Sequence, residues 1–309
     1  MVDRVTTQTQ MRAAQRNLQD NMTHLARLQE QASTLKTINR SSDDPTAAAA
    51  AMSVRSELRA VDQYTSNADN GNDWLTTIES SLGSVSDIMN RVRDLTVRGS
   101  NSGSLSATAK EAIAIEIDGL KTDLLSQSNT KFLGRSVFAG SSNAPTAFTA
   151  VPPANGTDPV TYEFTGGEGS VERRISATST VRVDADGGTI FGADVNTGSP
   201  SVFELLDTIV ADLRSTATGN VSAHLGSLDE RMAIMTGQRS ELGARQVQLE
   251  RAQSTLLDKA GALEARRSGI EDADLGQVIL DLKLQEVTYQ AALAVTARVL
   301  QPTLMDFLS

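Results

Sequence analysis

The stretch from Leu228 to Ile270, LDERMAIMTGQRSELGARQVQLERAQSTLLDKAGALEARRSGI, decides the fold of this chain. A large apolar residue stands at every seventh position in it: Leu228, Met235, Leu242, Leu249, Leu256, Leu263 and Ile270. Because seven residues make almost two helical turns, these side chains lie along one side of a helix, and we call them the spine. One helix of this length extends over roughly 65 Å.

A second line of positions beside the spine begins apolar and then becomes polar. Its members are Leu225, Met232, Arg239, Gln246, Gln253, Ala260 and Arg267. A tight two-stranded coiled coil favours apolar residues at such positions. We therefore expect this helix to pack against several shorter helices, and the alternative is a long core helix of an ordinary bundle.

Composition narrows the possible functions. The chain has 309 residues, no cysteine, two histidines, one tryptophan and a formal net charge of −10. Without cysteine, a disulfide scaffold, a thiol nucleophile and a cysteine metal site are excluded. The negative charge and the lack of a basic patch argue against nucleic-acid binding. The first residues form no conventional signal peptide, and no apolar run is long enough for membrane insertion.

The centre of the chain differs from its two sides. Five of the seven prolines and many glycines fall within residues 141–202, which we expect to form a small β domain. Residues 160–164, 170–175 and 179–183 are its strand candidates. We expect Asp186-Gly187-Gly188 to form a tight turn before Thr189-Ile190-Phe191.

Helices are expected on both sides of this centre. Asp44-Pro45 is a helix start, because Asp44 caps free N–H groups and Pro45 has none to leave unsatisfied. Thr108 to Glu111 has capping-box spacing and is expected to open a shorter helix. The expected fold class is mainly α, a long helical coiled coil or bundle built from both chain ends with a small inserted β domain.

The two chain ends are complementary in charge. Residues 1–40 contain six Lys or Arg against three Asp or Glu, and residues 271–309 contain two against six. Both ends also have an apolar helical stripe, so we expect them to pair as a two-helix arm. Both ends folding onto the main bundle is the alternative. The predicted assembly interface consists of Met11, Leu18, Leu25, Leu28, Leu35, Leu275, Ile279, Leu282, Tyr289, Leu293 and Leu300.

No cluster of residues predicts catalysis, a metal ion or another cofactor. His24 and His224 have no second histidine at a ligand spacing. Asp184 to Gly187 resembles a fragment of a calcium loop, but a β-turn explains it better. Lys131 and Arg135 flank Phe132-Leu133-Gly134, which we interpret as a loop with solvated charges.

Motifs near both ends resemble the flagellin superfamily. At the N-terminal side these are residues 39–45, the alanine-rich helix that follows, Arg55 to Leu58, and Arg91 to Val97. At the C-terminal side they are Ile270 to Leu275, Gln290 to Leu293, and Val299 to Leu308. The resemblance covers roughly 1–140 and 205–309 and holds in order at both ends.

Within the superfamily, the chain resembles the hook-associated protein 3 family, which joins the flagellar hook to the filament. Pro45, residues 132–141 and residues 304–308 carry this likeness. It implies a structural protein that is secreted by type III export, has no enzymatic activity and is located extracellularly at the hook-filament junction. The implied partners are further copies of the chain in a ring or helical layer, the preceding hook-associated junction protein, flagellin and an export chaperone.

The resemblance also implies a division into three parts. Residues 1–42 and 271–309 would form an inner assembly arm of paired terminal helices. Residues 43–140 and 203–270 would form a helical rod domain, and 141–202 the β domain. Filament flagellin, a secreted coiled-coil adhesin and an enzyme-bearing flagellin remain as alternatives, although residues 141–202 contain no histidine for an active site.

Overall fold

The computed structural model describes residues 7–101, 105–152, 160–167, 169–192, 200–215 and 220–299. The chain divides into two compact units. Unit 1 contains Met1–Ala60 and Lys259–Ser309, and unit 2 contains Val61–Asp258. The three-part division expected from the sequence stays a prediction.

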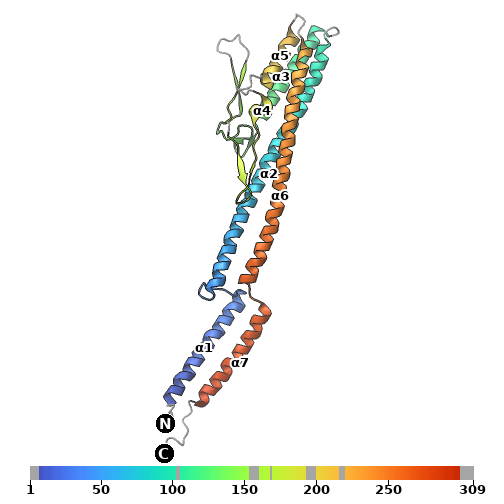
Figure 1. Ribbon diagram of the computed structural model, residues 1–309. Coiled ribbons are helices and arrows are strands. Elements are labelled where there is room, and N and C mark those ends of the chain that lie inside the picture. Colours follow the sequence, from blue (N-terminus) through green and yellow to red (C-terminus); the bar gives the residue numbers. More distant parts are fainter. Residues whose placement is uncertain are drawn as a thin grey trace, which may run out of the picture. The chain divides into compact units, whose positions relative to one another are not determined.

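Long helices dominate both sides of the chain, which confirms the expected fold class (Figure 1). They are α1 (Thr7–Thr34), α2 (Pro45–Ser100), α3 (Ala107–Ser128), α5 (Val202–Arg214), α6 (His224–Glu271) and α7 (Leu275–Val299). The short helices α4 (Gly187–Phe191) and η1 (Val221–Ala223) complete the helical part. None of the described helices is apolar over a length that could cross a membrane.

The start of α2 follows the prediction. Asp44 Oδ1 accepts hydrogen bonds from the backbone N–H groups of Thr46 and Ala47, both at 2.9 Å, and Pro45 is the first helical residue. The start of α3 corrects the capping-box prediction at Thr108. Ser106 caps this helix by accepting the N–H of Ala109 at 3.2 Å, because its hydroxyl is the one that precedes the first helical turn.

The strands form three separate antiparallel pairs. They are β1 (Lys131–Phe132) with β2 (Arg135–Ser136), β3 (Phe148–Val151) with β4 (Thr161–Phe164), and β5 (Glu172–Arg174) with β6 (Thr180–Arg182). The last three strands, β4, β5 and β6, lie within the strand segments predicted from the sequence. The pair β1–β2 corrects our interpretation of residues 131–135 as a loop.

The predicted turn at Asp186-Gly187-Gly188 is wrong, because these residues begin α4. The Asp186 carboxylate accepts the N–H groups of Gly188 at 2.9 Å and Thr189 at 3.4 Å and so acts as a helix cap. A Cβ atom at Gly187 would lie 2.6 Å from the carbonyl oxygen of Phe138. Glycine is therefore required by close packing here and does not signal a hairpin turn.

Aromatic rings join the strands to the helices of unit 2. Phe148 of β3 meets Phe191 of α4 and Phe203 of α5 with ring centroids 5.5 and 5.4 Å apart. Tyr162 of β4 stacks on Phe203 at 4.9 Å. These side chains belong to one apolar core with residues of α2, α3 and α6. Asn129 fixes β3 through its side-chain oxygen, which accepts the N–H groups of Ala147 and Phe148.

Within unit 2, α6 lies antiparallel along α2. Arg93 pairs with Asp229, Glu79 with Arg239, and Asp69 with Gln253, so partners descend along one helix as they ascend along the other. This corrects our expectation of several shorter partner helices. The polar positions beside the spine are compatible with one long partner, because α2 supplies carboxylates to Arg239 and Gln253.

The spine predicts a large loss of stability when a charge is placed in it. Leu242 is 3 % exposed, and we expect Leu242→Asp to lower the free energy of unfolding by about 3 to 5 kcal/mol. The melting temperature followed by circular dichroism should fall by about 10 °C. Ala244→Asp, on an exposed position of the same helix, is the matched control. An unchanged melting curve for Leu242→Asp would contradict the packing described.

Candidate functional site: the terminal helix pair

Helices α1 and α7 lie side by side in unit 1 (Figure 1). Leu18, Leu25 and Leu28 of α1 are partly buried, as are Leu282 and Tyr289 of α7. The amide of Gln285 donates to the backbone oxygen and the side-chain oxygen of Asn21, at 3.2 and 3.1 Å. The two chain ends therefore form a helix pair.

Other members of the predicted assembly interface are exposed. Leu35, Leu275, Ile279 and Leu293 keep between 41 and 49 % of their surface accessible. The side chain of Met11 and all of Leu300 lie outside the described residues. The predicted set is thus divided between residues buried in the helix pair and residues open to solvent, and its role in assembly remains a prediction.

A second apolar face of α7 was missed in the sequence. Leu280, Leu284, Val287 and Val295 are each more than 60 % exposed. Their spacing of four, three and eight residues places them on one side of the helix, and this periodicity was available in the sequence. Helix α7 is therefore apolar on the side that meets α1 and also on a side that no described residue covers.

The segments that precede α2 and α7 are hydrogen-bonded to each other. The N–H of Thr37 donates to the oxygen of Glu271 at 2.7 Å, and the N–H of Ala273 donates to the oxygen of Leu35 at 3.0 Å. The Thr37 hydroxyl also donates to the oxygen of Asp272 at 3.1 Å. We call residues 35–37 and 271–273 the connector bridge. It ties the end of α1 to the start of α7 and so fixes which parts of the two helices meet.

A buried carboxylate lies in this connector bridge. Glu271 is 4 % exposed, and its Oε2 accepts a hydrogen bond from Arg55 at 2.7 Å. This hydrogen bond lowers the pKa of Glu271 and raises the pKa of Arg55; burial acts in the opposite direction on both groups. The charges of Lys36 and Arg267 also lower the pKa of Glu271. Glu271 is therefore held ionised.

The opposite net charges of the two chain ends do not produce ion pairs between the described residues of α1 and α7. No ion pair between described residues joins α1 to α7. Arg27 pairs with Asp43, Arg40 with Glu30, and Lys283 with Glu286. Apolar packing and the connector bridge therefore hold the pair together, and the charge difference adds only a long-range attraction.

The spine residues lie on the buried side of α6. Leu228, Met235, Leu242, Leu249, Leu256 and Leu263 are each less than 9 % exposed, and Ile270 is partly buried. Gly71 of α2 allows close approach, since a Cβ atom there would lie 3.2 Å from Leu249 and 3.1 Å from Val183. The six buried side chains are thus structural and are not free to bind a partner.

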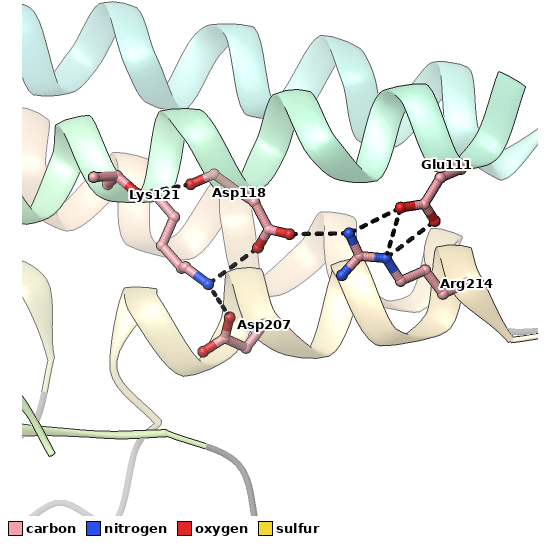
Figure 2. A network of polar contacts seen from close by, with 6 residues as sticks. Glu111, Asp118, Lys121, Asp207 and Arg214 are labelled. Carbon is pink, nitrogen blue, oxygen red and sulfur yellow. Dashed lines mark hydrogen bonds and ion pairs between the residues drawn. The ribbon is translucent and has the colours of Figure 1, made fainter. Parts of the chain in front are cut away.

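A polar network joins α5 to α3 (Figure 2). Lys121 forms ion pairs with Asp118 on its own helix, at 3.1 Å, and with Asp207 of α5. Arg214 of α5 reaches Glu111 at 3.1 Å and Asp118 at 3.2 Å. Burial of Lys121 opposes its charge, but the two carboxylates outweigh burial and raise its pKa. All its members are ion-paired, so the network is a clamp between helices.

Two of the remaining chemical candidates, His224 and Asp184, have structural partners. His224 lies 2.8 Å from Asp212, and His24 is exposed. Asp184 is fully buried, where it accepts the N–H of Val171 and binds Arg182. The described residues contain no group of three or more His, Asp or Glu that could hold a metal ion.

Comparisons with known proteins agree with the long helices at both chain ends. The model of the bacterial flagellin N-terminal helical region matches residues 5–143, and that of the C-terminal helical region matches residues 225–308. The chain belongs to the flagellin family. It is a structural protein of the bacterial flagellum, with a family that includes filament flagellins and hook-associated proteins.

Relatives of both kinds are similar to this flagellin-family chain. The flagellin of Bacillus subtilis is 30 % identical over 84 % of each chain. The flagellar hook-associated protein 3 of Salmonella typhimurium is 24 % identical over 94 % of each chain. The solved structure of a putative flagellar hook-associated protein from Vibrio parahaemolyticus has the same fold, with a TM-score of 0.66 and 23 % identity over 74 % of this chain and 100 % of that one.

The Arg55–Glu271 pair predicts an acid-sensitive connector bridge. Because the folded pKa of Glu271 lies below its usual 4.5, the stabilisation is complete above about pH 4.5 and is lost as the pH falls through the lowered value. Hydrogen exchange at the amides of Thr37 and Ala273 in the unaltered protein should therefore become slower than in Glu271→Gln as the pH rises from acid to neutral, and the two should converge in acid. The control is Glu286→Gln, which removes an exposed ion pair within α7. Hydrogen exchange at the same two amides should be as in the unaltered protein. Equal exchange in Glu271→Gln and the unaltered protein at neutral pH would refute the role of the pair.

The clamp between α3 and α5 predicts that the loss of stability is larger when a part-buried ion pair is broken than when an exposed one is broken. Asp207→Asn leaves the part-buried Lys121 with one carboxylate, and we expect a loss of stability on the order of 1 to 2 kcal/mol. Glu111→Gln, in the exposed part of the network, should cost less than about 1 kcal/mol. Urea unfolding of both variants measures the difference, and an equal or reversed order would contradict the clamp.

Proposed function

We propose that this protein is a junction subunit that connects the flagellar hook to the filament, with α1 and α7 forming an inner layer of the assembly. The observation that carries the proposal is the second apolar face of α7. A helix that is apolar on opposite sides needs cover on both, and α1 covers one side. Neighbouring subunits would cover the other.

A helical assembly suits such a surface. Contacts between different faces of identical subunits repeat along a helix or close into a ring. The partners of the protein would then be further copies of itself in that layer, the preceding hook-associated junction protein on the hook side and flagellin on the filament side. A flagellar export chaperone would bind it before secretion. The protein would act outside the cell and without enzymatic activity.

Two observations favour a junction role. The similarity to the Salmonella typhimurium hook-associated protein 3 extends over 94 % of both chains. In the sequence, Pro45 and the segment 132–141 resemble the junction family more than filament flagellin. A second candidate, filament flagellin, is supported by the 30 % identity to the Bacillus subtilis protein.

Electron microscopy distinguishes the two functions. Purified protein is added to isolated hooks that already bear the preceding junction protein, and flagellin is added afterwards. A short collar that stops growing and then permits filament growth supports the junction role. Long tubes formed by this protein alone would show a filament flagellin, and the absence of both a collar and tubes would overturn both functions.

The open face of α7 can be tested in the same assay. We expect Leu284→Asp to abolish attachment to the hook without altering the melting of the isolated protein, because Leu284 is 68 % exposed. Gln290→Asp, an exposed polar position of α7, is the control and should attach. A protein lacking residues 275–309 should keep unit 2 folded and fail to attach. Attachment by the truncated protein would refute the inner-layer role.

A further inference from the structure

The hairpin formed by β1 and β2 has an unusual residue at its apex. Leu133 and Gly134 connect the strands with φ angles of +48° and +81°. A two-residue turn with both φ angles positive favours asparagine or glycine, and a leucine is strained there. Leu133 is also 77 % exposed, so its side chain gains no burial within its own chain. Strain without a gain in packing points to a function outside the monomer.

The hairpin is firmly attached to unit 2. The ring of Phe132 meets the edge of Trp74 with centroids 5.4 Å apart, and Ser136 is buried. The guanidinium of Arg173, on β5, lies 5.6 Å from the centre of the Trp74 ring. Leu133 is therefore presented on a fixed base, and Arg173 lies beside the same tryptophan.

Positive charge collects around this apex. Arg135 lies close enough to Arg173 that its charge adds to burial in lowering the pKa of Arg173. No carboxylate of the described residues forms an ion pair with Lys131, Arg135 or Arg173. By contrast, the arginines at the contacts of α2 and α6 with neighbouring helices have carboxylate partners, namely Arg91, Arg93 and Arg239. An unpaired cationic cluster within a chain of net charge −10 calls for an anionic partner.

Helix α3 has an exposed face with the complementary features. Ile115 is 59 % exposed, Gly119 leaves open space where a Cβ would stand, and Asp123 is exposed. Their spacing of four residues aligns them along one side of the helix. The face thus offers an apolar contact, a gap and a carboxylate in a row.

We propose that the hairpin apex, Leu133 with Lys131, Arg135 and Arg173, docks on the exposed α3 face of a second copy of this chain. Leu133 packs beside Ile115 over Gly119, and Arg135 pairs with Asp123. Like charge would otherwise keep acidic subunits apart, and this contact gives them one attractive orientation. The inference rests on the proposed function only in requiring that copies of the chain assemble.

Charge exchange tests the pair. Arg135→Glu should reduce the number of assembled subunits by about tenfold or more, and Asp123→Arg should do the same. The double variant, in which both charges are exchanged, should restore assembly. Two single variants that assemble normally, or a double variant no better than either, would overturn the contact.

The strain at Leu133 allows a sharper test. Leu133→Asn should leave the melting temperature of the isolated protein unchanged or raise it, and should reduce assembly. The control is Leu257→Asn, because Leu257 is 74 % exposed on α6 and lies outside the cluster. A Leu133→Asn protein that assembles like the control would refute the role of the apex.

Cross-linking identifies the partner. The chain has no cysteine, so Lys131→Cys provides a single site for a benzophenone maleimide label. The labelled protein is then incorporated into flagella, or into any polymer that it forms, and cross-linked by light. Cross-links to α3 of a second copy support the proposal, and cross-links to another protein, or none to a second copy, overturn it. Since loss of residues 275–309 tests the proposed function separately, a normal collar with no effect of the hairpin variants would refute this inference alone.

Discussion

Burial of the α6 spine against α2 is the interaction on which the rest of unit 2 depends. Five spine side chains of α6 in unit 2 are buried, and each contributes roughly 1.5 to 3 kcal/mol of gross hydrophobic stabilisation. The contacts of Asp229, Arg239 and Gln253 with α2 then select one antiparallel register among those that apolar packing alone would allow. The strands and α5 attach to this base through the aromatic rings of Phe148, Phe191 and Phe203.

The terminal helices of unit 1 follow a different design. Helix α7 is covered on one side by α1, and Leu280, Leu284 and Val287 remain exposed on another. An isolated pair of helices gains little stability in water. The connector bridge and the Arg55–Glu271 ion pair therefore supply part of the stability that packing alone does not provide. Incomplete burial is costly for a monomer, but it provides the surface that an assembling subunit needs.

Much of the helical fold could be predicted from the sequence. The seven-residue period of the spine and the pair Asp44-Pro45 have direct physical meanings, and the structure contains the expected helices. The β1–β2 hairpin was missed because Leu133 lacks the turn chemistry that marks such hairpins. Helix α4 was missed because the role of Gly187 depends on Phe138, which is distant in sequence. The pairing of Arg239 with Glu79 likewise follows from tertiary contact.

The candidate site was less predictable. The stripe of α1 and the α1-facing side of α7 followed from periodicity, and the open side of α7 had the same signal but was overlooked. Glu271 could not be identified, because its burial and its contact with Arg55 depend on residues more than 200 positions away. A cryo-electron microscopy structure of hooks bearing this protein would test the central claim most directly. Our account predicts that Leu280, Leu284 and Val287 are buried against a neighbouring subunit, and finding them exposed to solvent in the assembly would contradict it.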